Sequence, residues 1–180
     1  CIDPLINRIH NDTGNKWSTT AITPGTPFMK KLNTTLSQYF KDKDNIIFSG
    51  SDVYGEGEHK LFEHLRTSSI SKDSNIIIYG LDADLIMLGL NHLSFNENLY
   101  LYRETPTYIN SLNNSLDKND DYLLELSKLS EAIIYSMTNT YDKNKMYDYI
   151  FLGLMLGNDF MPHFPAINIR TNGIDILLNH

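Results

Sequence analysis

The chain has 180 residues, 41% of them hydrophobic, which is enough for a domain with its own apolar core. Its net charge is −7 (15 Lys and Arg against 22 Asp and Glu), the wrong sign for binding nucleic acid mainly through a basic surface. A single cysteine excludes an internal disulfide framework, and no apolar run has the length of a membrane span. Because the first residue is Cys1, we expect that the chain is a piece of a longer protein.

The first regular element that the sequence predicts is a helix that begins at Pro27. Pro24-Gly25 is a turn signal, and Thr26 offers a side-chain cap. Pro27 suits the first helical position, because its missing N–H has no partner there in any case. Apolar residues then recur at helical spacing: Phe28, Leu32, Leu36, Tyr39 and Phe40. We therefore interpret Thr26 as a cap rather than as a ligand-binding residue.

A first pair of acids follows, where a strand is predicted to give way to a helix. The run from Ile46 to Ser49 predicts a short buried strand, and a helix is expected from Glu58 to Ser68. Glu56 and Glu58 would then face a helix N-terminus, whose partial positive charge favours ionised carboxylates. The alternative is that both are solvated acids of a first turn. For His59, a structural hydrogen-bonding role is favoured over metal binding or proton transfer.

A second pair of acids lies in the stretch around which the chain is organised. The apolar run Ile76–Tyr79 leads into Asp82 and Asp84, and a second apolar run follows. This order predicts a buried strand, a tight turn and a helix, with both carboxylates at the turn. Two carboxylates beside a core are costly unless they are compensated, and Mg²⁺ or Mn²⁺ would compensate them. The alternative, that both simply cap a helix, is equally open from this stretch alone.

Two successive strand–acidic turn–helix units predict an α/β fold with a largely parallel sheet. In such sheets ligands bind beyond the carboxyl ends of the strands, so both acidic pairs are expected at that edge. Further along, the sequence predicts a strand over Leu99–Tyr102, a polar insertion or linker over residues 105–121, a helix from Tyr122 to Met137 and a buried helix from Tyr147 to Leu156. Gly157 is the expected helix end. The P-loop pattern is absent from the sequence, which argues against a P-loop nucleotide hydrolase.

The candidate site residues are five acids: Glu56, Glu58, Asp82, Asp84 and Asp159. If they converged without cations, their charges would repel and raise each other's pKa values. Two divalent ions about 4 Å apart would relieve that repulsion and could support phosphodiester hydrolysis. An Asp-x-Asp pair also occurs in glycosyltransferases that hold a nucleotide sugar through Mn²⁺. The Glu-Gly-Glu and Gly-Asn-Asp segments of this chain have no place in that scheme.

Six motifs in register resemble the 5′→3′ exoribonucleases of the Xrn family. They are Ile22-Thr23-Pro24-Gly25-Thr26, Ser49-Gly50-Ser51, Gly55-Glu56-Gly57-Glu58-His59-Lys60, the stretch from Tyr79 to Met87, Arg103-Glu104, and the segment from Gly157 to His163. The resemblance implies a PIN-like, flap-nuclease-related α/β core. It also implies removal of nucleotides, dependent on Mg²⁺ (or Mn²⁺), from single-stranded RNA that carries a 5′-monophosphate.

On this resemblance, the five acids match the family's metal-binding and catalytic acids. Residues 1–104 correspond to the end of the family's N-terminal nuclease region, and residues 122–180 to the start of its helical middle region. The resemblance also leads us to expect an intracellular protein, cytoplasmic rather than nuclear, that does not engage membranes.

The sequence departs from the family pattern at three places: Tyr54, Ser18-Thr19-Thr20 and Pro27. The family's further acids and its basic 5′-phosphate pocket lie nearer its N-terminus than this chain reaches, so we expect the fragment alone to be inactive. Two alternatives stay open: a flap-type, structure-specific endonuclease, and a catalytically weak RNA-binding scaffold relative.

Overall fold

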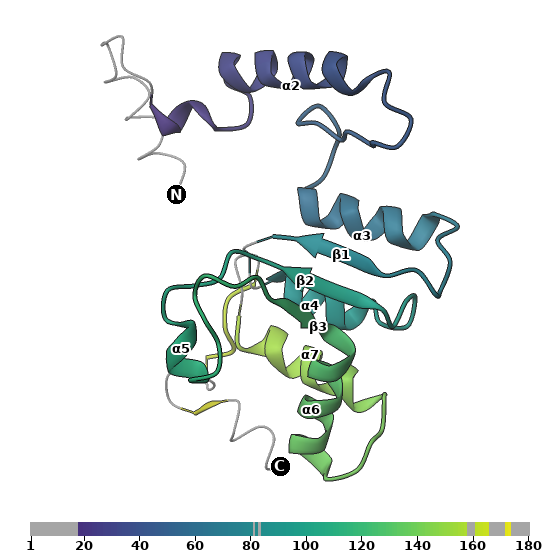
Figure 1. Ribbon diagram of the computed structural model, residues 1–180, viewed down its shortest axis with the longest axis vertical. Helices are drawn as coiled ribbons and strands as arrows, with labels where there is room; N and C mark the ends of the chain where they lie inside the picture. Colours follow the sequence, from purple (N-terminus) through teal and green to yellow (C-terminus); the bar gives the residue numbers. More distant parts are fainter. Residues whose placement is uncertain (1–17, 81, 83, 158–160, 166–171, 174–180) are drawn as a thin grey trace. The chain divides into compact units, whose positions relative to one another are not determined.

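The computed structural model describes residues 18–80, 82, 84–157, 161–165 and 172–173. The chain divides into two compact units, Cys1–Leu61 and Phe62–His180, which we describe one at a time (Figure 1). Helix α3 (Gly57–Thr67) contains the point at which the first unit ends and the second begins. None of the described helices is long and apolar enough to cross a membrane.

The first unit contains the short 3-10 helix η1 (Thr19–Ala21) and helix α2 (Pro27–Phe40). The start of α2 is as predicted: the Thr26 hydroxyl oxygen accepts the Met29 N–H at 3.3 Å, and Pro27 is the first helical residue. The same hydroxyl donates to the Ala21 carbonyl at 2.6 Å. Thr26 therefore ties the turn at Pro24-Gly25 to the helix, as a cap should.

The predicted strand over Ile46–Ser49 is wrong for the described structure, because this stretch has no regular secondary structure. Ile47 is 75% exposed, and the stretch pairs with no strand among the described residues. An apolar run becomes a strand only where another strand takes up its backbone N–H and C=O groups. The run alone did not reveal whether such a partner exists.

The second unit is built on a three-stranded sheet in the order β1-β2-β3. Strands β1 (Ile76–Tyr79) and β2 (Leu99–Tyr102) are parallel and joined through helix α4 (Asp84–Asn91), as predicted. Strand β3 (Leu123–Glu125) pairs antiparallel with β2, with Leu101 opposite Leu124. The described fold is therefore α/β with a small mixed sheet, and the expected parallel arrangement is present as one parallel pair.

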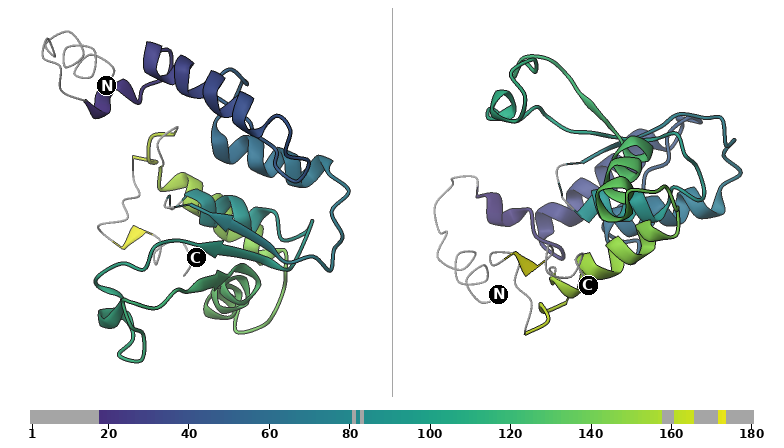
Figure 2. Two further views of the ribbon diagram at one scale, coloured as in Figure 1. Left: turned by 45° about the horizontal axis from the view of Figure 1, so that its top comes forward. Right: turned by 90° about the horizontal axis from the view of Figure 1, so that it is seen from below.

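Strand β3 also corrects the predicted helix from Tyr122 to Met137. Helix α6 (Leu126–Thr138) begins four residues later, because the chain before it pairs with β2. Between β2 and β3 the polar segment 105–121 leaves the sheet, forms the short helix α5 (Ile109–Leu112) and returns (Figure 2). The Thr105 hydroxyl donates to the Asp120 carbonyl at 2.6 Å, so the two ends of this excursion are held together.

The core of the second unit lies between the sheet and helices α4, α6 and α7 (Lys145–Met155), which contact one another (Figure 1). Its most deeply buried side chains are Ile78, Leu99, Leu126 and Ile134, and Phe62 of α3 is equally buried. Gly89 allows α4 to approach closely, since a Cβ there would lie 2.3 Å from Leu126 Cδ1. A larger residue at this position would therefore have to displace the buried Leu126 side chain.

Helix α7 confirms the predicted helix near Tyr147–Leu156 but not its burial. Only Met146 is buried among its described side chains, while Tyr147 and Phe151 are 48% and 63% exposed. An almost wholly apolar run predicts a helix but does not by itself show what covers each face.

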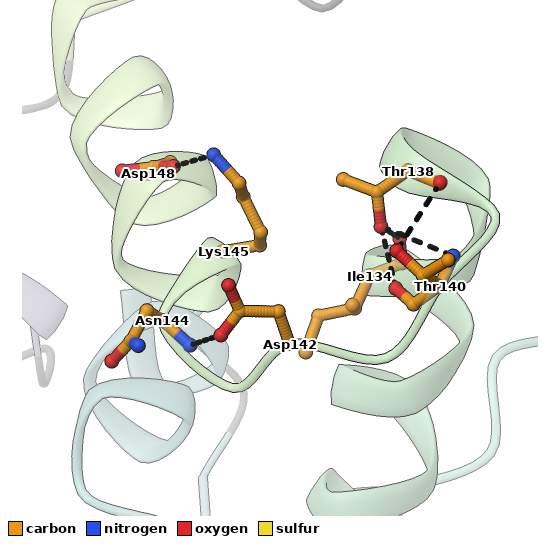
Figure 3. Close-up of polar contacts among 7 residues, drawn as sticks. All are labelled: Ile134, Thr138, Thr140, Asp142, Asn144, Lys145 and Asp148. Carbon is orange, nitrogen blue, oxygen red and sulfur yellow. Dashed lines mark hydrogen bonds and ion pairs between the residues drawn. The ribbon is translucent and has the colours of Figure 1, made fainter.

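The connection between α6 and α7 is fixed by local polar contacts (Figure 3). The Thr138 hydroxyl donates to the carbonyls of Ile134 and Thr140, at 3.1 and 2.5 Å. On α7, Lys145 Nζ lies 2.9 Å from Asp148 Oδ2. After α7, Gly157 has a φ of +87°, the left-handed conformation that was expected of a glycine at a helix end.

Candidate active site

The Asp82–Asp84 turn lies directly beyond the carboxyl end of β1. The N–H of Gly80 donates to the Tyr102 carbonyl at 3.1 Å, which extends the parallel pairing by one residue. Helix α4 then begins at Asp84, and Asp82 Oδ1 accepts the N–H of Asp84 at 3.2 Å. Asp82 is exposed and Asp84 is half-buried. One Asp82 oxygen therefore helps to start α4, and the carboxylate still reaches solvent.

Gly80 lets the buried side chain of Leu85 pack against this turn. A Cβ at Gly80 would lie 2.1 Å from Leu85 Cδ1, and Leu85 is a buried residue in the first turn of α4. The core side chain that follows Asp84 thus occupies the space that a side chain at position 80 would need. This packing holds the strand end and the helix start close together, which fixes where the two aspartates emerge.

The parallel register brings a further acid to the same edge. Because Tyr79 lies opposite Tyr102, the residues after both strands leave the sheet side by side. The Tyr79 hydroxyl donates to Glu104 Oε1 at 3.2 Å, and the two tyrosine rings lie 5.6 Å apart. The negative charge of Glu104 and this hydrogen bond raise the pKa of Tyr79 above its ordinary value. Glu104 was part of a recognised motif, but its tyrosine partner was not predicted.

The first acidic pair lies at the start of α3. Glu58 is in the first turn, and the Glu56 carbonyl accepts the Lys60 N–H at 3.1 Å. The Glu56 carboxylate is 3.7 Å from His59 Nδ1, and both side chains are more than half exposed. Gly55, with a φ of +97°, makes the turn before them. The helix half of the predicted strand–acidic turn–helix unit is present, and the strand half is not.

Lys60 organises the loop in front of this pair. Its ammonium group donates to the carbonyls of Gly50 and Val53, at 3.0 and 3.3 Å. Since a lysine head group is held by two backbone oxygens here, it stabilises the loop that leads to Glu56. Lys60 was part of a recognised motif, and only the structure shows this role.

The described candidate acids lie in two pairs on two units: Glu56 with Glu58, and Asp82 with Asp84. Asp159, the fifth candidate, lies outside the described residues. Within the part of the chain that the structure describes, no three His, Cys, Asp or Glu side chains form one metal-binding group. Each pair nonetheless offers carboxylate oxygens at a helix start, the ligand type that hard divalent cations prefer.

The chain has a β–α–β unit with two carboxylates beyond its first strand. It therefore belongs to the class of α/β proteins with an acidic site at the carboxyl ends of the sheet strands. The family described as "XRN 5'-3' exonuclease N-terminus" matches residues 5–105, and the one described as "Xrn1 helical domain" matches residues 140–180. The chain belongs to the Xrn family.

Three curated relatives show how much of such a protein the chain represents. It is 36% identical over 188 residues to "5'-3' exoribonuclease 1" of Saccharomyces cerevisiae, covering 92% of this chain and 12% of the relative. The proteins of the same name from Schizosaccharomyces pombe and Homo sapiens are 35% and 33% identical, over 91% and 92% of this chain. The chain spans 14% and 11% of their lengths.

Proposed function

We propose that this chain carries part of the active centre of a 5′→3′ exoribonuclease that degrades single-stranded RNA bearing a 5′-monophosphate. The observation that carries the proposal is the Asp82–Asp84 turn at the carboxyl end of β1, in a chain of the Xrn family. Relatives that align over about nine-tenths of this chain are named exoribonucleases, which supports the same activity here.

The chemistry of the donor set fits divalent cations. In our proposal, Glu56, Glu58, Asp82, Asp84 and Asp159 hold Mg²⁺ or Mn²⁺. All five offer hard oxygen ligands, and two ions would balance most of their charge. When bound, such an ion pair would supply an activated water and charge stabilisation for phosphodiester hydrolysis.

The described residues would act by setting the position of these carboxylates. The hydrogen bond from the Asp84 N–H fixes one oxygen of Asp82, and the tight packing at Gly80 fixes the turn. On the other unit, Lys60 holds the loop before Glu56 in place. Preorganised ligands of this kind do not have to be ordered again in each catalytic cycle.

The proposal extends to the finer fold and the setting of the protein. We propose a PIN-like core whose sheet is largely parallel, in which the β1–β2 pair is one part. We also propose an intracellular, cytoplasmic location. The 180-residue chain by itself should be inactive, since the proposed nuclease needs acids and a 5′-phosphate pocket from elsewhere in the protein.

The test uses the full-length protein and one RNA, labelled at its 3′ end, that carries a 5′-monophosphate, a 5′-triphosphate or a 5′-hydroxyl. With Mg²⁺, we expect loss of the monophosphate RNA alone, and none with Asp84→Asn or with EDTA. Asp73→Asn is the matched control, because Asp73 is exposed in the loop before β1. Internal cuts that ignore the 5′ end would instead show an endonuclease, and binding without cleavage would show a scaffold relative.

A further inference from the structure

The described structure has an apolar cavity beside the Asp82 turn. The proposed metal chemistry does not use this cavity. Its volume is about 310 Å³, which lies at the lower end of the range for small-molecule pockets. Ile86 of α4, Leu101 of β2 and Leu124 of β3 line it from the sheet and α4, and of these three only Leu101 is buried. Pro106 and Tyr108 line it from the excursion between β2 and β3.

The excursion that forms the outer wall of the cavity is held in place at its neck. The Tyr122 ring lines the cavity, and its hydroxyl oxygen accepts the Asp117 N–H at 2.7 Å. The Tyr102 hydroxyl donates to Asp121 Oδ1 at 2.8 Å, and Thr105 is bonded to the Asp120 carbonyl. A wall that is tied down in this way can receive a flat group with little loss of conformational entropy.

The charged residues around the cavity indicate which chemical groups it could bind. Asp82 lies at the cavity, and Glu104 and Asp121 are bonded to the tyrosines at the same sheet edge. Arg103 is the sole cation among the residues that line the cavity in the described structure. Carboxylates without bound cations repel phosphate, whereas a neutral aromatic ring finds mainly apolar walls, two tyrosines and one arginine among the lining residues.

We propose that this cavity binds a nucleobase of the RNA close to the acidic turn, and that Tyr108 is the residue on which the base stacks. This inference rests on the proposed exoribonuclease function and adds a base-binding pocket to it. The pocket would hold a base through its flat face, so it would be tolerant of sequence. It would hold the strand through a base and leave the phosphates to the proposed metal ions.

The experiment measures RNA binding by the full-length protein in EDTA, where hydrolysis is not needed for the readout. The RNA carries a fluorescent 2-aminopurine, or an abasic nucleotide, at each position in turn. We expect Tyr108→Ala to weaken binding about tenfold and to relieve the quenching of 2-aminopurine at one position, since stacking on one aromatic residue contributes on that scale. Tyr108→Phe, which retains the ring, should bind as the wild type does.

The control variant is Tyr39→Ala, because Tyr39 in α2 is 63% exposed and Tyr108 is 60% exposed. An abasic nucleotide at the quenched position should weaken binding to the wild type by the same factor. Tyr108→Ala should then cause no further loss of affinity for that abasic RNA. If Tyr108→Ala weakens abasic and intact RNA equally, or behaves as Tyr39→Ala does, the pocket proposal is overturned. A wild-type protein that neither binds nor degrades RNA would instead overturn the proposed function.

Discussion

His92 offers a sharp test of the packing between α3 and α4. It is 5% exposed, and its Nδ1 lies 2.6 Å from the Leu88 carbonyl oxygen. A carbonyl only accepts, so Nδ1 carries the proton, and Nε2 of the neutral ring accepts from Arg66 Nη1 at 2.7 Å. The ring also stacks near Phe62, with centroids 4.5 Å apart. Protonation of His92 would place an N–H against the guanidinium of Arg66.

The pH dependence follows from the pKa of His92. Burial lowers this pKa below its ordinary value, and the positive charge of Arg66 lowers it further, while the bond to Leu88 opposes both. Between the folded and unfolded pKa values the unfolded chain binds more protons, so the folded state loses stability as the pH falls. Stability should be complete above about pH 6.5 and fall below it, by at most about 1.4 kcal/mol per pH unit.

The perturbation is Arg66→Met, which leaves the Nε2 of His92 without its described donor. A hydrogen bond to a charged group contributes about 1.5–3 kcal/mol to stability. Because Arg66 is exposed, we expect its bond to His92 to contribute about 1 kcal/mol to the local opening free energy. Hydrogen exchange of α3 and α4 amides, corrected for intrinsic rates, measures the local opening free energy at pH 7.5 and 5.5. His92→Phe should remove the pH dependence.

Lys72→Met is the control for this prediction. Lys72 lines the same surface cavity as Arg66 and His92 but has no described hydrogen bond to the ring. Its loss should leave the opening free energy of α3 and α4 unchanged. Equal effects of Arg66→Met and Lys72→Met, or a wild-type opening free energy that does not change between pH 7.5 and 5.5, would refute the reasoning.

Three further substitutions probe the packing and capping described above. Gly80→Ala should lower the exchange protection of α4 by about 1–3 kcal/mol and slow RNA degradation, because its Cβ would overlap Leu85. Unchanged activity would count against the proposed role of the turn. Gly89→Ala should cost a similar amount of stability through Leu126, measured as lost exchange protection in α6. Thr26→Ala should cost α2 about 1 kcal/mol, and Thr26→Ser, which keeps the cap, should not.

The local sequence predicts the described elements where the spacing of apolar residues and the capping or β-branched residues indicate the same element. The run Ile76–Tyr79, three β-branched isoleucines and a tyrosine, becomes β1, and Thr26 followed by Pro27 starts α2. The strand Leu123–Glu125 was missed because Tyr122 fits the helical period of Leu126, Leu129 and Ile133, so the predicted helix ran through it. Only pairing with β2, some twenty residues earlier, makes that stretch extended, and a local pattern does not contain such a partner.

The candidate site was predictable to the same extent. Glu58 and Asp84 were placed at helix starts from sequence, and both are in the first turns of their helices. The hydrogen bonds of Tyr79 with Glu104 and of Tyr102 with Asp121 were not predicted, because they depend on the register of β1 against β2 and on the path of the excursion. Convergence of the acidic pairs stays a prediction.

Helix capping and metal binding, the two interpretations that the sequence left open for Asp82 and Asp84, are compatible in this structure. The described hydrogen bond runs from the Asp84 N–H to one Asp82 oxygen, and it holds the Asp82 carboxylate at the turn. A carboxylate has two oxygens and about four acceptor positions, so a cap of this kind leaves the group able to bind a cation. A substitution that keeps the cap but removes the charge, Asp82→Asn, therefore separates the two roles: α4 should remain as protected from exchange as in the wild type, while Mg²⁺-dependent degradation is lost.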